Sequence, residues 1–428
     1  MDSKLIGVFG LASFVALAWA LSANRRRFPW RTVLWGLGLQ FVFAVLILQT
    51  TAGRMLFDFT GKAINKLISF ANEGCAFVFG PLASGDALAK AFGPGNSFIF
   101  AIVVTGTIIL VAALSSLFFH WGILQKVVRA FAWVMRKAMR TSGSETLSAT
   151  ANIFMGQTEA PLLVKPYIPR MTRSELLCMM TGGMATLAGG VAAVYVKMAS
   201  DAGHPDFAGH LLTASVMNAP AALLVSKILL PETETSETAG TGTAEVPRTT
   251  SNSIDALCRG AGDGMQLAVN VLAMLIAFIA VIHLANFLLT QGQTAIGIAQ
   301  PATLQTVFGW CNAPFAWLMG VPAQDCLAVG GVLGERVVLN EFIGYVSLNK
   351  AADATAVPLP IDPRSYVIAT YALCGFANFA SIAIQVGGIG SLAPERRSEM
   401  AKLGVRAMLG GLLACYLSAT IAGIVLPK

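Results

Sequence analysis

Three adjacent polar side chains interrupt an apolar region near the middle of the chain. Residues 155–161 read MGQTEAP, which places an amide, a hydroxyl and a carboxylate side by side at Gln157, Thr158 and Glu159. These groups donate and accept directional hydrogen bonds, the chemistry by which a protein recognises a small polar molecule. The flanking glycine and proline predict a turn at this point rather than a continuous helix.

A second polar interruption occurs in the other half of the chain. Residues 334–345 read GERVVLNEFIGY and put Asn340 and Glu341 between two apolar arms. Two interpretations of Glu341 are open: it contacts a ligand, or it forms a structural ion pair with Arg336.

The composition indicates the environment of these groups. Of 428 residues, 55% are hydrophobic and 12% are charged, against roughly 25% charged in soluble domains, and the mean hydropathy is +0.68. Because a spanning helix needs about 20 mostly apolar residues, the chain is predicted to be an all-α polytopic membrane protein. The eight predicted transmembrane spans are Leu5–Ala23, Thr32–Thr51, Ser97–His120, Leu176–Val196, His210–Leu230, Met265–Leu289, Tyr366–Gly388 and Gly404–Leu426.

Positive charge predicts the orientation. Basic residues gather at positions 25–31, 126–140 and 396–406, after the first and third spans and before the last. Because short basic loops stay in the cytoplasm, both termini are expected on the other side of a bacterial inner membrane. The net charge of +7 is then explained by loops next to anionic lipid, with no nucleic-acid partner. The first span is expected to be retained rather than cleaved, because arginines follow it.

Cysteine and histidine give no sign of a metal site. The seven cysteines form no CxxC pair, and the four histidines are scattered. The cysteines are expected to be packing thiols rather than metal ligands or disulfide partners.

Two halves with the same order of elements flank a hydrophilic segment. Residues 231–253 are rich in Thr, Glu and Gly, which predicts a loop. In each half an interrupted stretch precedes a broken span: residues 141–172 before TGGMATLAGG at 181–190, and residues 321–350 before CGFANFAS at 374–381. Irregular backbone survives at membrane depth only where protein or a watery cavity satisfies it, so a substrate site between inverted repeats is predicted. Glycine pairs that allow tight helix packing are the alternative explanation.

The first interruption is predicted to be a re-entrant helical hairpin. Its apolar arms, residues 147–155 and 161–169, are each too short to span a membrane and flank the polar tip. Free helix ends at such a tip leave backbone groups for a ligand or an ion. A cytoplasmic loop with a solvated Glu159 is the alternative, suggested by the nearby basic residues Lys165, Arg170 and Arg173. Intramembrane carboxylates nevertheless indicate function, because their cost must be offset.

Three separated motifs resemble the concentrative nucleoside transporter family in its bacterial eight-span form. They are ANIFMGQTEAPL from Ala151, NEF from Asn340 and GFANFAS from Gly375, in the family's order and across essentially the whole chain. The resemblance implies a homotrimer in which a mobile transport domain moves against a scaffold. Stretches at Met55–Asn72 and Ile123–Arg140 resemble the family's external and internal interfacial helices.

The resemblance also implies how the chain is divided and which residues bind substrate. The expected parts are a scaffold at 1–120, a first transport unit at 121–230, a cytoplasmic loop at 231–253, scaffold span 6 at 254–300 and a second transport unit at 301–428. The residues implied for the nucleobase are Gln157, Thr158, Glu159, Val191 and Phe376, and those for the ribose are Glu341, Asn378 and Ser381. The chemistry is coherent, because a carboxylate accepts bonds from paired sugar hydroxyls and an aromatic ring covers the face of a base.

Sodium is the coupling ion that the resemblance implies; no other cofactor is expected. The family's sodium site corresponds here to Asn152, Met155, Thr186 and Leu187. Sodium suits oxygen ligands, which carbonyls at broken helices supply. Some bacterial members resemble this pattern yet couple to protons, for which Glu159 or Glu341 would suffice.

The chain is thus predicted to be a cation-coupled symporter that imports nucleosides such as uridine, with sodium favoured and protons as the alternative. A transporter of another small polar solute would share the inverted repeats. A membrane enzyme could use Glu159 and Glu341 as acid and base, but no nucleophile, metal cluster or phosphate loop accompanies them in the sequence. A channel would show flux that does not saturate and no uphill accumulation.

Overall fold

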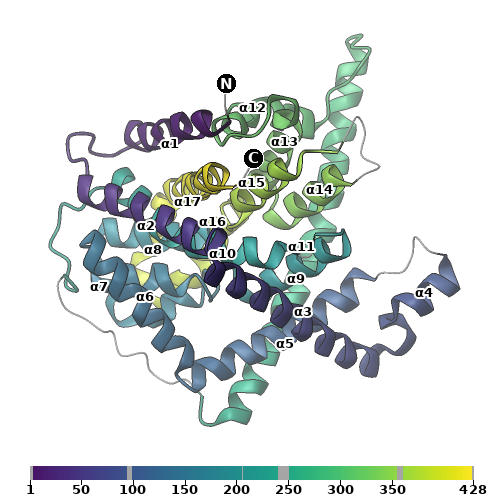
Figure 1. Ribbon diagram of the computed structural model, residues 1–428, viewed down its shortest axis with the longest axis horizontal. Helices are drawn as coiled ribbons and strands as arrows, with labels where there is room; N and C mark the ends of the chain where they lie inside the picture. Colours follow the sequence, from purple (N-terminus) through teal and green to yellow (C-terminus); the bar gives the residue numbers. More distant parts are fainter. Residues whose placement is uncertain (1–2, 94–98, 205, 240–249, 354–359, 427–428) are drawn as a thin grey trace.

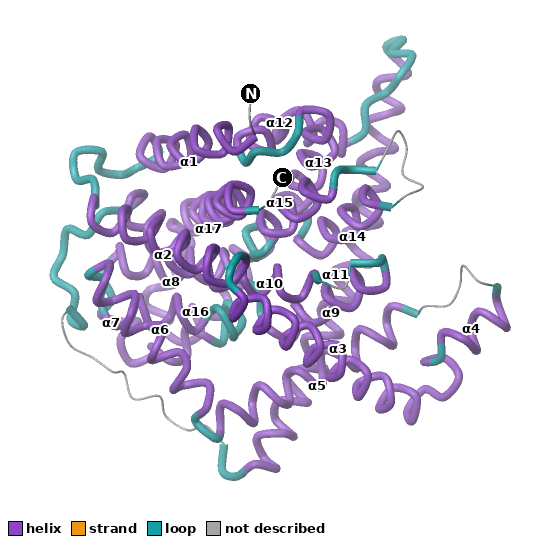
Figure 2. The backbone as a smooth tube through the Cα atoms, in the orientation of Figure 1, coloured by secondary structure: helices purple, strands orange, loops and turns teal. Residues whose placement is uncertain are grey.

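The computed structural model describes residues 3–93, 99–204, 206–239, 250–353 and 360–426, which form helices joined by turns and loops without a strand (Figures 1 and 2). The expected all-α class is confirmed. The helices at the predicted spans are α1 (Ser3–Ala20), α2 (Trp30–Leu48), α5 (Phe100–His120), α8 (Arg173–Ala185) with α9 (Gly189–Asp201), α10 (Phe207–Leu229), α11 (Ser253–Ala295), α15 (Pro363–Leu373) with α16 (Phe379–Leu392), and α17 (Arg397–Val425). The predicted start of the third span, Ser97, lies outside the described residues.

The remaining α-helices of the described chain join these segments. They are α3 (Thr51–Phe79), α4 (Gly85–Phe92), α6 (Ile123–Met139), α7 (Gly143–Ala151), α12 (Leu304–Leu318), α13 (Cys326–Val338) and α14 (Glu341–Ala352). By length and composition, six stretches of the described chain could each cross a membrane: Ser3–Ala20, Trp30–Leu48, Lys62–Phe92, Ala101–His120, Phe207–Leu229 and Pro394–Val425.

Helix α3 is longer than the interfacial helix predicted at Met55–Asn72. It continues to Phe79 because the turn residues Gly80 and Pro81 come only after that point. Gly80 has a φ of +59°, a conformation that ends the helix and that glycine adopts at little cost. Most of the added residues are apolar, so the helix contributes to the stretch from Lys62 that is long enough to span.

Helix α17 lies in the middle of the molecule and packs against α1, α8, α10, α15 and α16 (Figure 1). Small residues permit this close packing: a Cβ added at Gly411 would lie 2.9 Å from the Met184 side chain on α8. In a bilayer, van der Waals contact at such small residues drives helix association, since lipid tails are as apolar as leucine.

Both predicted breaks in the spans are present. Helix α8 ends at Ala185, Thr186 has extended backbone, and α9 begins at Gly189. Helix α15 ends at Leu373, and α16 begins at Phe379 after an N-cap in which Asn378 Oδ1 accepts from the Ser381 amide at 2.8 Å.

The two hairpins have different second arms. In the first hairpin, α7 ends at Ala151, earlier than predicted, and the second arm (Ala160–Arg170) is a 3₁₀-helix. Pro166 and Pro169 inside this arm disfavour an α-helix, since each lacks the amide hydrogen that an α-helix interior requires. The second hairpin consists of α13 and α14, and Asn340 caps α14 by accepting from the Ile343 amide at 3.0 Å.

Residues 231–239 of the hydrophilic loop pack onto the helix ends of the first half. The Thr238 carbonyl accepts from the Gly143 amide at 3.1 Å, and Ser236 Oγ donates to Glu175 Oε1 at 2.5 Å. A buried ion pair between Lys227 and Glu145, with an N–O distance of 2.7 Å, lies beside them. This segment of the predicted loop is therefore held by specific contacts; residues 240–249 lie outside the described chain.

Candidate substrate and ion site

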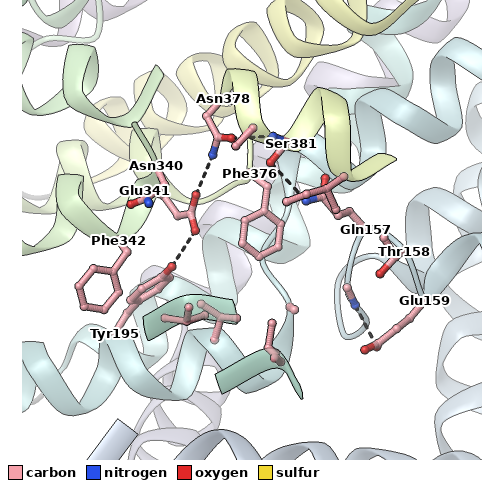
Figure 3. A pocket seen from close by; sticks show the side chains of 17 residues that line it. Gln157, Thr158, Glu159, Tyr195, Asn340, Glu341, Phe342, Phe376, Asn378 and Ser381 are labelled. Carbon is pink, nitrogen blue, oxygen red and sulfur yellow. Dashed lines mark hydrogen bonds between the residues drawn. The ribbon is translucent and has the colours of Figure 1, made fainter. Parts of the chain in front are cut away.

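A cavity of about 180 Å³ lies between the two hairpin tips and the two broken helices (Figure 3). One water molecule needs roughly 10–15 Å³ of such space, so the cavity has room for a small organic molecule. Its lining includes every residue that the sequence analysis assigns to substrate: Gln157, Thr158, Glu159, Val191, Glu341, Phe376, Asn378 and Ser381. Leu267 and Val271 from the long helix α11 also line it, so the cavity lies between α11 and the two hairpin units.

Glu341 is buried at one end of this cavity, held by two neutral donors (Figure 3). The Tyr195 hydroxyl donates to Oε1 at 2.8 Å, and Asn378 Nδ2 donates to Oε2 at 3.1 Å. Glu341 is also the first residue of α14, where the free amides and the helix dipole favour negative charge. These features stabilise a carboxylate that still has acceptor capacity on both oxygens.

The structural ion pair between Glu341 and Arg336 is not formed. The ion pairs within 4.0 Å that the described residues make do not include it. Arg336 is buried on α13 and donates instead to the Ala372 carbonyl at 2.5 Å and to Cys415 Sγ at 3.3 Å. Among the described residues, no basic side chain therefore forms an ion pair with the Glu341 carboxylate, which leaves it available to a ligand.

Gln157, at the tip of the first hairpin, presents a hydrogen-bond donor to the cavity. Gln385 Nε2 donates to the Met180 carbonyl at 3.0 Å and to Gln157 Oε1 at 3.1 Å. Because a carbonyl can only accept, the Met180 contact fixes the Gln385 amide, and Gln385 in turn fixes that of Gln157. Gln157 Nε2 then faces Ser381, donating to its Oγ at 3.2 Å (Figure 3).

Glu159 and Phe376 complete the polar and aromatic lining. Glu159 Oε2 accepts from the Gly156 amide at 3.2 Å, which closes the hairpin tip, and its side chain remains exposed. Arg170, which suggested a cytoplasmic loop, pairs with Glu237 at 2.8 Å and does not line the cavity. The Phe376 ring lies between Glu341 and Gln157 (Figure 3), where it can cover the face of a planar ligand.

The residues assigned to sodium include an oxygen without a partner. Asn152 is fully buried; its Nδ2 donates to the Ser148 carbonyl at 3.0 Å, while Oδ1 has no hydrogen-bond partner among the described residues. Buried polar atoms are rarely left unpaired. Thr186 Oγ1 donates to the Gly182 carbonyl at 2.9 Å and keeps its lone pairs. Both oxygens suit a hard cation.

Met155 and Leu187 belong to backbone that meets at the same place. A Cβ added at Gly182 would lie 3.5 Å from Asn152 Nδ2, and one at Gly189 would lie 3.2 Å from the Phe154 carbonyl. The tip of the first hairpin therefore lies directly against the break between α8 and α9. Carbonyls of such interrupted helices are free to bind a cation.

Comparison with protein families assigns most of the chain. Residues 9–82 match the N-terminus and residues 210–423 the C-terminus of the Na⁺-dependent nucleoside transporter, and residues 101–202 match a nucleoside recognition (gate) region. The chain belongs to the Na⁺-dependent nucleoside transporter family. The resemblance to concentrative nucleoside transporters is thus confirmed, and the members are transporters rather than enzymes.

Relatives of this transporter cover both of its halves. An uncharacterized transporter of Haemophilus influenzae is 41% identical over 425 residues, which are 99% of this chain and 98% of that protein. Sodium/nucleoside cotransporter 1 of Rattus norvegicus is 37% identical over 98% of this chain and 64% of its own length. The structure of CNTnw in an inward-facing substrate-bound state gives a TM-score of 0.91 at 37% identity, covering 99% of this chain and 98% of that one.

The transporter's cavity also contains residues that the sequence analysis missed. Tyr195 follows Val191 by four positions, and Gln385, which contacts Gln157 behind the lining, follows Ser381 by four. Helical spacing of four places both on the face of an assigned residue and could have identified them. Leu267 and Val271 carried no such signal, because they are ordinary apolar residues of a span.

Proposed function

We propose that this family member is a sodium-coupled symporter that imports nucleosides such as uridine by alternating access. The observation that carries the proposal is the buried Glu341 carboxylate, held by Tyr195 and Asn378 at the end of a cavity. Because no basic side chain among the described residues pairs with it, this carboxylate can accept bonds from two adjacent ribose hydroxyls. Membership of the family and the relationship to a sodium/nucleoside cotransporter support the choice of substrate class and ion.

Each end of the cavity has a distinct proposed role. Glu341, Asn378 and Ser381 hold the ribose, while the donor of Gln157, with Thr158 and Glu159, reads the edge of the base. Phe376 packs on the face of the base and Val191 borders it. A sugar without hydroxyls would leave the buried Glu341 poorly satisfied, and the transporter should discriminate against it.

Sodium is the proposed coupling ion, bound by Asn152, Met155, Thr186 and Leu187. The unpartnered Asn152 oxygen beside the hairpin tip supports this site. Sodium binding would order the tip that carries Gln157, so that ion and nucleoside favour each other's binding. A proton taken up by Glu159 or Glu341 is the alternative to sodium.

Alternating access would come from motion of the two hairpin units against a scaffold. The proposed scaffold comprises residues 1–120 and 254–300. Its helix α11 lines the cavity with Leu267 and Val271, and the two hairpin units would move along this helix. We further propose a homotrimer in the bacterial inner membrane, with both termini outside the cytoplasm. The net charge of +7 then serves contact with anionic lipid.

Uptake of labelled uridine into proteoliposomes tests this function. An inward sodium gradient is compared with sodium-free buffers that contain or lack an inward proton gradient. Accumulation that requires sodium is the expected result. Accumulation driven by protons alone would overturn sodium coupling, and no uptake under any gradient would overturn the nucleoside as substrate.

Tyr195→Phe is expected to weaken uridine binding by roughly 2- to 10-fold, because one hydrogen bond contributes about 0.5 to 1.5 kcal/mol. The change removes the hydroxyl that donates to Glu341 and keeps the ring. Tyr345→Phe is the matched control: its ring centroid lies 4.6 Å from that of Tyr195, but its hydroxyl donates to the Thr370 carbonyl. Competition of unlabelled with labelled uridine measures the uridine affinity of both variants. Equal affinities of Tyr195→Phe and Tyr345→Phe would contradict the prediction.

A further inference from the structure

One buried amide joins the breaks of the two spans. Asn218, on α10, is fully buried. Its Nδ2 donates to the Ala185 carbonyl at 2.7 Å and to the Cys374 carbonyl at 2.7 Å. Ala185 is the last residue of α8, and Cys374 directly follows the last residue of α15. A single side chain from a third helix therefore contacts both interruptions.

The two carbonyls need such a donor. The last carbonyls of a helix have no partner within it, and an unpaired one in the interior of a membrane protein is costly. A primary amide carries two hydrogens on one nitrogen and can serve both carbonyls at once. The Asn218 Oδ1 has no hydrogen-bond partner among the described residues, so the contacts of this amide are made by its donor.

The two breaks also touch each other directly. A Cβ added at Gly375 would lie 2.7 Å from the Met184 carbonyl oxygen and 2.7 Å from the Ala185 carbonyl carbon. Only glycine leaves room for this approach of one backbone to the other. Cys415 Sγ on α17 lies 3.5 Å from the Ala185 carbonyl and 3.2 Å from the Cys374 carbonyl, and its single S–H is a weak donor that these two carbonyls must share.

Each carbonyl that accepts from Asn218 precedes a different proposed binding site. Thr186, assigned to sodium, directly follows Ala185, and Phe376 and Asn378, assigned to nucleoside, closely follow Cys374. A shift of either break would change the hydrogen bonds of Asn218. Because one nitrogen holds both, a shift in one break is opposed by the other.

We propose that Asn218 is a positioning residue that couples sodium binding at the α8–α9 break to nucleoside binding at the α15–α16 break. This inference rests on the proposed function. Sodium fixes the backbone at Thr186. Through its two hydrogen bonds, Asn218 then restricts the backbone at Cys374 as well. The residues after Cys374 that contact ribose and base become fixed in turn. Coupling between binding sites is reciprocal, so uridine must raise the affinity for sodium by the same factor.

Equilibrium binding of tritiated uridine to the purified full-length protein tests the proposal. The readout is the ratio of the uridine Kd without sodium, with choline at equal ionic strength, to the Kd in saturating sodium. The wild-type ratio should be at least about fivefold, the lower range of typical couplings. Asn218→Ala should reduce the ratio to less than about half of its wild-type value, and uridine should no longer raise sodium affinity to the wild-type extent.

Two further variants keep the test decisive. Asn218→Ser retains one donor and should give an intermediate ratio, which provides the measurement even where the alanine variant fails to fold. Ser215→Ala removes a hydroxyl on the same helix that contacts the Cys374 thiol rather than its carbonyl, at 3.5 Å, and should retain the wild-type ratio.

A purely structural role for Asn218 predicts another result. Both Kd values would then rise together, and a ratio unchanged in the alanine and serine variants would overturn the inference while the proposed function stands. Wild-type protein that binds no uridine, or binds it equally without sodium, would instead overturn the proposed function and this coupling with it.

Discussion

Glu341→Gln is expected to reduce uridine uptake by roughly 10- to 150-fold, because a hydrogen bond to a charged group contributes about 1.5 to 3 kcal/mol. A carboxylate offers two acceptor oxygens to ribose, whereas an amide offers one. The new NH₂ group would also face the Tyr195 hydroxyl or the Asn378 amide, both of which now donate to Glu341. Initial rates of uridine uptake into proteoliposomes at saturating sodium, normalised to inserted protein, measure the loss.

The sugar itself provides a second readout for Glu341. Wild-type protein should prefer uridine to 2′,3′-dideoxyuridine, and the glutamine variant should lose most of that preference, because the missing hydroxyls would no longer meet a carboxylate. Glu335→Gln is the matched control, since Glu335 is buried on the first arm of the same hairpin and does not line the cavity. Wild-type uptake by Glu341→Gln would remove this residue from the ribose site.

Asn152→Ala is expected to raise the sodium concentration for half-maximal uptake by about tenfold or more, since a contact with a charged group contributes about 1.5 to 3 kcal/mol. The substitution removes the buried Oδ1 atom that has no partner among the described residues. Uridine affinity measured at very high sodium should change much less, because Asn152 does not line the substrate cavity.

Thr150→Ala is the control for the ion site. Thr150 is buried on the same hairpin arm, but its hydroxyl already donates to the Thr146 carbonyl at 2.7 Å. Uptake as a function of sodium concentration should therefore match that of the wild type. If Asn152→Ala and Thr150→Ala both keep the wild-type sodium dependence, the ion binds elsewhere.

Local features of the fold could be predicted because they depend on neighbouring residues. The spans followed from apolar length, and the breaks followed from glycine and polar residues within 181–190 and 374–381. The two internal prolines of the second arm, Ala160–Arg170, also disfavour an α-helix there, although the sequence analysis predicted only an apolar arm. The length of α3 was misjudged because its amphipathic start continues into an apolar end.

Features that depend on distant partners could not be predicted. The loop segment 231–239 has a polar composition typical of a free loop, yet Ser236 donates to Glu175, 61 positions earlier. For Glu341 the sequence left open an ion pair with Arg336 beside a ligand contact, but the structure directs that arginine to Ala372 and Cys415 instead. Nearness in sequence was misleading here, because the two residues belong to different arms of the hairpin.

The sequence by itself determined that this protein is helical and membrane-embedded, which family it resembles, and which polar residues interrupt its spans. These properties are carried by composition and by motifs of a few residues. Only the tertiary structure decided the contacts of those residues: Tyr195 reaches Glu341 across 146 positions, and Gln385 reaches Gln157 across 228. Such contacts depend on how helices pack against one another, and one side chain such as Asn218 can then hold two distant breaks together.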